Sequence, residues 1–293
     1  MFNKNIKEVI AGYFGKLPEF NDFVKFNAGA PEILFIDNWL QEGLAYIKLK
    51  YKSSWKDKYE NLAPTRFFIP VPSSGRIVSG MLYASKDKSG RDFPFIIFSV
   101  IPAGQLNEFY LLPAALEQMI IMLDFYLRKE DQLASLNDTL KNVNFNPVDN
   151  HSLKSDFLQY LTGTRMSEFL KRTKLDHSML NINEIAYTES TYIKLSFISD
   201  DSHFFNDAGF LIYLLNKKIN MNERQSSIFW TIDGGEQFRL LIFPFKLLPL
   251  NFADLISLEN EVDRSLELKS SEEYTDNESP ENGISLEGYL KSF

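Results

Sequence analysis

The stretch FPFIIFSVI at residues 93–101 decides the fold class. Apolar side chains fall on both faces of this stretch, whereas a strand with one solvated face alternates apolar and polar residues. The stretch therefore predicts a central β-strand that is covered on both sides. The preceding segment, SKDKSGRD at 85–92, is polar and contains one glycine, which is typical of the turn of a hairpin.

The segments around this strand predict an α+β fold. Short apolar runs between turn residues predict strands, and apolar residues at three-to-four-residue spacing predict helices. The expected elements are strands at 9–14, 66–71, 76–84, 191–198, 227–232 and 237–244, and helices at 31–51 and 107–133. Because neighbouring strands are joined by short turns, we expect a mixed, largely antiparallel sheet flanked by helices on both faces.

Changes of composition predict the domain organisation. An Asn/Asp-rich stretch at 137–151 indicates an internal boundary, so residues 1–135 and 136–262 are expected to form two lobes of one compact body. The tail at 263–293 is acidic and poor in apolar residues until its end, which predicts disorder. Its apolar ending, ISLEGYLKSF at 284–293, fits either a segment that orders on meeting a groove or a solvated extension.

Composition excludes several classes of function. The chain has 293 residues, and 31 Lys and Arg against 39 Asp and Glu give a net charge of −8, which argues against nucleic-acid binding. Because there is no cysteine, disulfides and thiolate sites are excluded. The start of the chain lacks the apolar core of a signal peptide, and polar residues interrupt the apolar stretch 111–127. We therefore expect no export signal and no insertion into membranes.

Motifs for catalysis are missing from the sequence. It contains no HExxH, GxSxG, Walker or GxGxxG pattern, so it lacks the signatures of the common metal, hydrolase and nucleotide-binding sites. We accordingly predict no catalytic, cofactor-binding or metal-binding residues.

An unusual loop, GYFGKLPEFNDFV at 12–24, places Lys16 and Asp22 beside several aromatic residues. Arg66 and Arg91 lie at the ends of predicted strands, where they could face this loop. One interpretation is that these four residues hold an anion or a partner's backbone. The other is that Lys16 and Arg91 pair with Asp22 and Asp92 and only fix the loop.

Four ordered groups of residues resemble one known family. The first follows the pattern G-x-x-G-K-x-P-x-x-x-D-F, and the second is a W-L-x-x-G-L helix. The third is a G-R-x-F-P strand entry, and the fourth an S-x-F-W element with LP after it. The matching residues are Gly12, Gly15, Lys16, Pro18, Asp22 and Phe23; Trp39, Leu40, Gly43 and Leu44; Gly90, Arg91, Phe93 and Pro94; and Ser227, Phe229, Trp230, Leu248 and Pro249. The chain thus resembles the TagF/ImpM proteins associated with bacterial type VI secretion.

The resemblance implies a cytoplasmic, non-enzymatic accessory protein. Such a protein represses type VI secretion after translation by binding and sequestering the forkhead-associated scaffold protein. Two rivals stay open: an assembly factor that binds other type VI secretion components, and a small-ligand or anion sensor that uses the loop at 12–24. Candidate partner-binding or loop-fixing residues are Lys16, Asp22, Arg66 and Arg91, whereas the motif residues expected to be structural are Gly15, Pro18, Phe23, Trp39, Pro94, Ser227 and Trp230.

Overall fold

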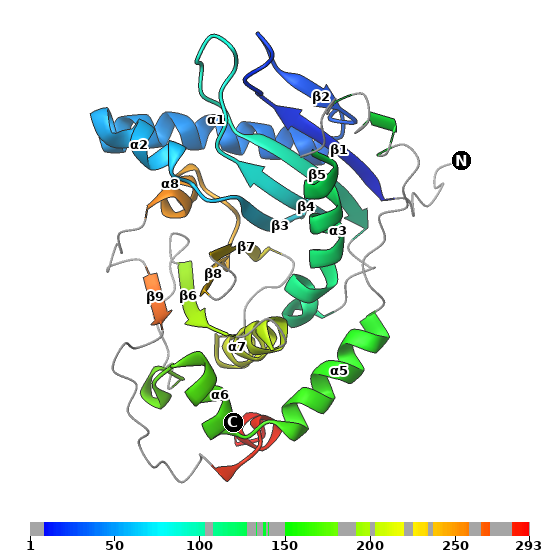
Figure 1. The fold of residues 1–293 in the computed structure, drawn as a ribbon, viewed down its shortest axis with the longest axis vertical. Coiled ribbons are helices and arrows are strands. Elements are labelled where there is room, and N and C mark those ends of the chain that lie inside the picture. Colours follow the sequence, from blue (N-terminus) through cyan, green and yellow to red (C-terminus); the bar gives the residue numbers. More distant parts are fainter. Residues whose placement is uncertain are drawn as a thin grey trace.

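A computed structural model gives the arrangement of the chain (Figure 1). The structure describes residues 9–102, 108–127, 133, 137–138, 140, 150–180, 192–199, 203–219, 225–233, 237–257, 265–269 and 283–292. Within these residues, one nine-stranded sheet has the order β2-β1-β5-β4-β3-β7-β8-β6-β9. The strands are β1 (Ile10–Gly15), β2 (Val24–Phe26), β3 (Thr65–Val71), β4 (Arg76–Tyr83), β5 (Phe95–Pro102), β6 (Tyr192–Ile198), β7 (Ser227–Asp233), β8 (Gln237–Phe243) and β9 (Ser265–Lys269).

The pairing of the strands confirms the predicted fold class. Every neighbouring pair is antiparallel except β6 and β9, which are parallel. β5 lies between β1 and β4, as expected of a central strand. Its residues Ile96 and Phe98 belong to one hydrophobic cluster, and Phe95 and Ile97 belong to the other. Both faces of the strand are therefore covered. This coverage explains why apolar residues occupy both faces and do not alternate with polar ones.

Helices cover both faces of the sheet (Figure 1). One face packs against α1 (Pro31–Tyr51), α2 (Trp55–Glu60) and α8 (Pro249–Ile256). The opposite face carries a cluster that includes residues of α3 (Leu112–Leu127), α5 (Asn150–Gly163), α6 (Met166–Thr173), α7 (Phe204–Ile219) and α9 (Leu286–Leu290). Short 3-10 turns lie at Lys52–Ser54, Phe109–Leu111 and His177–Leu180. The predicted helix at 107–133 falls on Phe109–Leu111 and α3, with 103–107 and 128–132 outside the described residues.

The sheet and both hydrophobic clusters cross the predicted boundary at residue 135. β3 pairs with β7, so strands from the two halves of the chain are direct neighbours. Trp39 on α1 packs against Phe229 on β7 and Phe252 on α8, with ring centroids 5.7 Å apart in both cases. Its indole nitrogen also donates a hydrogen bond of 3.0 Å to the carbonyl of Leu248. The two halves thus share one sheet and both cores.

The prediction of a disordered tail is wrong for two of its segments. Residues 265–269 form β9 beside β6, and residues 283–292 include α9. The backbone of Met166 donates to Ile284, and that of Leu286 donates to Thr164, while the side chains of Leu286 and Tyr289 are fully buried. The apolar ending therefore packs against its own chain, beside the junction of α5 and α6. Residues 270–282 lie outside the described residues.

The described part of the chain has neither a helix that could span a membrane nor a group of side chains that could bind a metal ion. No helix there combines the length and the apolar character that a crossing of the bilayer requires. Nor do His, Asp and Glu side chains gather there in a group of three that could hold a metal ion.

Candidate functional site

The loop that follows β1 begins at a glycine whose conformation other residues rarely adopt. Gly15 has a φ of +133°, and a Cβ atom there would lie 2.2 Å from the carbonyl oxygen of Pro94. A side chain at this position would therefore collide with the entry to β5. The glycine lets the start of the loop lie directly against the segment before that strand.

Asp87, which is buried, is the centre of a group of charged and polar side chains under this loop. The Lys16 Nζ atom lies 3.0 Å from Asp87 Oδ2, and the exposed fractions of the two side chains are 8% and 0%. Arg91 Nε donates to the same oxygen at 2.7 Å, and Ser89 Oγ donates to Oδ1 at 2.7 Å. The backbone amides of Ser89 and Arg91 also donate to Oδ1. We call these four residues, Lys16, Asp87, Ser89 and Arg91, the Asp87 cluster.

The Asp87 cluster keeps its carboxylate ionised. Burial by itself would raise the pKa of Asp87, because a charge is less stable away from water. Hydrogen bonds from Ser89, from the Arg91 backbone and from the side chains of Lys16 and Arg91 outweigh this effect and hold the pKa well below its ordinary value. At neutral pH the carboxylate is thus charged and binds two cations, Lys16 and Arg91.

The same cluster fastens the 16–23 loop to the 85–93 hairpin. Arg91 Nη2 donates to the carbonyl of Asn21 at 2.6 Å, and Ser85 Oγ donates to that of Lys16 at 2.7 Å. The amide of Lys88 donates to the carbonyl of Phe20 at 2.8 Å. Side chains and backbone therefore hold the loop at several points along its length.

The pairing predicted for Lys16 and Arg91 is wrong in its partners. Both cations bind Asp87, which lies in the turn between β4 and β5. Asp22 instead accepts a hydrogen bond of 2.8 Å from the amide of Phe23, and Asp92 forms a β-bridge with Lys86. Asp87 fills this role because the hairpin turn brings its side chain underneath the loop. Sequence reasoning offered no means of choosing among three nearby aspartates.

Arg66 does not join the Asp87 cluster. Its guanidinium forms a two-point hydrogen bond to Glu117, with Nε 2.9 and 3.0 Å from the two carboxylate oxygens. The exposed fractions of the two side chains are 14% and 7%. This pair joins β3 to α3 across the sheet face that carries α3. The four predicted residues therefore do not form one cleft.

The loop presents two aromatic side chains to solvent, and the ring of one of them, Phe23, is held by its neighbours. Phe23 is 46% exposed and Phe20 is 39% exposed. The ring of Phe23 packs edge-on against Phe93, with centroids 4.9 Å apart, and the Lys16 Nζ atom lies 5.2 Å from its centroid. Exposed aromatic residues that are already immobilised are favourable anchors for a protein partner, because little entropy is lost on binding.

A groove of about 510 Å³ lies between this loop and the first half of α1. Leu34, on the first turn of α1, is 54% exposed at its rim. The lining residues are Phe14, Asp22, Phe23, Val24, Lys25, Ala28, Ile33, Leu34, Asp37 and Gln41. We call it the loop groove. Of the predicted residues, Asp22 and Phe23 lie in its wall, whereas Leu34 and Asp37 belong to no motif and were not predicted.

Pro18 is exposed in the loop, whereas three other motif residues expected to be structural are buried. The exposed fractions are 4% for Trp39, 1% for Trp230 and 1% for Ser227. Trp39 joins α1 to α8, as described above, and Trp230 belongs to the opposite cluster, which contains residues of α3 and α7. These positions stabilise the fold and are not available to a partner.

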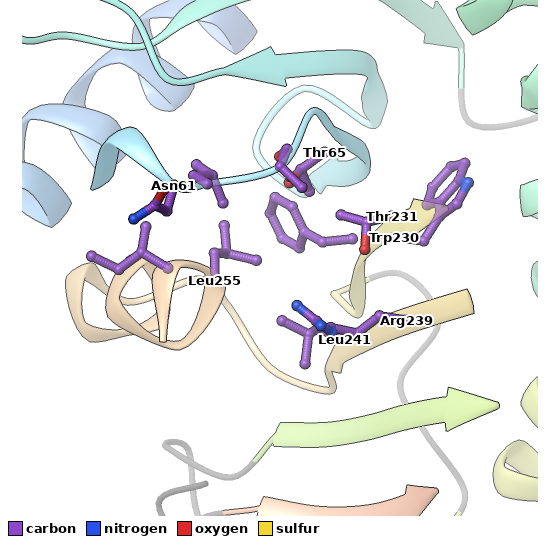
Figure 2. A pocket seen from close by; sticks show the side chains of 11 residues that line it. Asn61, Thr65, Trp230, Thr231, Arg239, Leu241 and Leu255 are labelled. Atoms are coloured by element: carbon purple, nitrogen blue, oxygen red, sulfur yellow. The ribbon is translucent and has the colours of Figure 1, made fainter. Parts of the chain in front are cut away.

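A second cavity, of about 290 Å³, lies where β7 and β8 meet residues 61–65 and the end of α8 (Figure 2). Thr231 and Arg239 line it, and Figure 2 shows the indole of Trp230 pointing away from it. Thr231 Oγ1 is buried and has no hydrogen-bond partner among the residues that the structure describes. Sequence reasoning missed this cavity because its walls come from four separate segments.

Comparison with protein families identifies the part of the chain that carries the loop. Residues 12–143 match the family of the TagF N-terminal domain, described as type VI secretion system-associated. The chain carries a TagF N-terminal domain. This domain includes β1 to β5, α1 to α3, the Asp87 cluster and the loop groove.

The crystal structure of PA0076 from Pseudomonas aeruginosa PAO1 is similar over 86% of this chain and 96% of its own, with 19% identity and a TM-score of 0.49. None of the curated proteins compared with the chain matches it.

Proposed function

We propose that this protein is a cytoplasmic, non-enzymatic repressor of bacterial type VI secretion. It acts after translation by binding the forkhead-associated scaffold protein and withholding it from the assembling machine. The type VI secretion-associated TagF domain supports the cellular process. For such a stoichiometric repressor, affinity and relative copy number set the response, because no turnover is needed.

The observation that carries the proposal is the use of the charged loop residues. Lys16 and Arg91 are both engaged by Asp87 under the loop, and Arg66 is engaged by Glu117 elsewhere. Their charges are therefore engaged by carboxylates of the chain itself, while Phe20 and Phe23 face solvent. A fixed surface with exposed aromatic residues suits a protein partner better than it suits a small anion.

Calorimetric titration tests the proposed binding. The full chain is titrated into the cognate forkhead-associated scaffold, without phosphorylation and at two salt concentrations. We expect saturable binding with a dissociation constant of about 1 μM or tighter. Absence of binding to a scaffold that is shown to be folded would contradict the proposal.

Deletion of the gene tests the direction of the effect in cells. A repressor predicts more secretion through the type VI machine when the protein is removed. Loss of secretion would instead support the rival in which the protein is an assembly factor. Secreted effector in the culture supernatant, measured against an equal amount of cells, distinguishes the two outcomes.

A further inference from the structure

We propose that the loop groove binds an extended segment of a partner protein that carries a basic side chain next to an apolar one. This inference rests on the proposed function, because it takes the partner to be a protein, and it specifies the chemistry that the partner must offer. Three properties of the groove carry it: its apolar surface, its two carboxylates and the strand edge beside it.

The groove has an apolar floor and exposed apolar side chains at its rim. Its floor is formed by Phe14 and Ile33, which are 5% and 1% exposed. Phe23 and Leu34 stand at the rim with 46% and 54% of their surfaces in water. Both belong to the small set of large apolar side chains that are exposed in the described part of the chain. Exposed apolar residues that border one groove indicate a binding surface for apolar side chains.

Two carboxylates in the wall of the groove specify the charge of the occupant. Asp22 accepts a hydrogen bond from the Phe23 amide, and Asp37 accepts one from Gln41 Nε2 at 3.0 Å. Within the residues that the structure describes, neither aspartate forms an ion pair, although Lys25 lines the same groove. A guanidinium or ammonium group from a partner would supply the missing cation, and the net charge of −8 would favour the approach of such a partner.

The neighbouring strand edge indicates that the occupant is extended. β2 is the outermost strand at its end of the sheet and pairs only with β1 among the described strands. Lys25 of β2 lies opposite Phe14 of β1, so both side chains point toward α1 and the groove. A segment added beside β2 would place every second side chain on that same side. Backbone pairing would supply affinity, and the groove would select the side chains.

The first test measures scaffold binding by groove variants. Asp22→Lys, Asp37→Lys and Phe23→Ala should each weaken binding about tenfold or more, because each removes a central contact. Glu42→Lys is the matched charge control, since this exposed residue lies on α1 outside the groove lining. Leu49→Ala is the apolar control, since Leu49 is 79% exposed on the same helix. The controls should change affinity less than about twofold.

These results separate the inference from the proposed function. If the scaffold binds the wild type and all groove variants equally, the groove proposal is wrong although the proposed function stands. A dimer of the chain that the groove variants dissociate, measured by sedimentation velocity, would assign the groove to a second copy and would also overturn the inference.

A second test does not need the scaffold. Two synthetic seven-residue peptides, Ac-AVRLVRA-amide and its glutamate counterpart Ac-AVELVEA-amide, are titrated into the full-length protein while amide NMR signals are recorded. The arginine peptide alone should shift signals of residues 22–26 and 33–41, and Asp37→Lys should abolish these shifts. Equal shifts with both peptides, or shifts confined to other residues, would overturn the proposal even if the scaffold does not bind.

Discussion

Two aspartates, Asp87 and Asp207, have side chains with no exposed surface, and each accepts hydrogen bonds from an arginine and a serine. Asp207, on the first turn of α7, also accepts one from Tyr160 on α5. Arg172 on α6 donates to it through Nη2 at 2.6 Å and Nε at 3.0 Å. The partner arginines differ in exposure: the side chain of Arg172 is 17% exposed and that of Arg91 is 60% exposed. We call Asp207, Arg172, Tyr160 and Ser199 the Asp207 cluster.

The difference between the two clusters lies in what each holds together. The Asp207 cluster joins three helices and the residue after β6, inside the layer that covers one face of the sheet. Burial, followed by the charge of Asp207, raises the pKa of Tyr160, so its hydroxyl stays protonated and remains a donor. The Asp87 cluster holds a loop whose outer side faces solvent. Similar chemistry therefore stabilises the whole fold in one place and shapes a binding surface in the other.

The largest effect is expected from Asp207→Ala. The variant leaves the Arg172 guanidinium and the Tyr160 hydroxyl without their acceptor in a buried place. Breaking a buried pair in this way lowers the free energy of unfolding by about 3–5 kcal/mol. Urea denaturation followed by circular dichroism measures this loss. A decrease below about 1 kcal/mol would show that water or a neighbouring group replaces the carboxylate.

Asp87→Ala should act mainly on the loop. Without the carboxylate, Lys16 and Arg91 lose their common acceptor, so the amides of residues 17–23 should exchange hydrogen faster. Scaffold affinity should fall about tenfold because Phe20 and Phe23 are no longer held in place. Hydrogen exchange and calorimetry measure the two effects, and Asp57→Ala, which removes an exposed carboxylate on α2, is the control. Uniformly faster exchange across the sheet would contradict the distinction between the clusters.

The Asp87 cluster also predicts sensitivity to acid. The pKa of Asp87 is lowered in the folded protein, so the unfolded state binds more protons once the pH falls below the ordinary value of 3.8. The stabilisation is present above that pH and is lost as the pH falls toward the lower, folded value. The melting temperature of the wild type should therefore fall more steeply than that of Asp87→Asn as the pH falls below about 4. Parallel curves for the two proteins would exclude this contribution.

Local patterns predicted the parts of the fold that depend on local interactions. The helix expected at 31–51 is observed with those bounds, because its apolar spacing and the proline at its first position are properties of one segment. The central strand was likewise evident from FPFIIFSVI, since only a doubly covered strand tolerates apolar residues on both faces. The strand β2 was missed, because three residues give no period.

Long-range partners could not be predicted from the same patterns. Aspartate is a residue type that favours the cap of a helix, whereas the structure places Asp207 within the first turn of α7. Its hydrogen-bond partners come from α5, α6 and the residue after β6. Composition also led to the wrong prediction of disorder for part of the tail. Its many acidic residues outweigh the few apolar residues whose side chains are buried in α9. In the candidate site, the loop was found by its motif, but its counter-ion and the groove beside it depend on how the hairpin and α1 pack.

The smallest effect is expected from Arg91→Ala. Together with Arg172→Ala, this variant compares the two clusters most directly. Arg91 is exposed, so its ion pair with Asp87 is screened by water and adds little to stability. Lys16 still pairs with the carboxylate, but the hydrogen bond from Arg91 to Asn21 is lost. Scaffold affinity should therefore fall only about threefold, with an unchanged urea midpoint. Arg172→Ala, the matching change in the Asp207 cluster, should lower that midpoint clearly, and equal effects of the two variants would contradict the assigned roles.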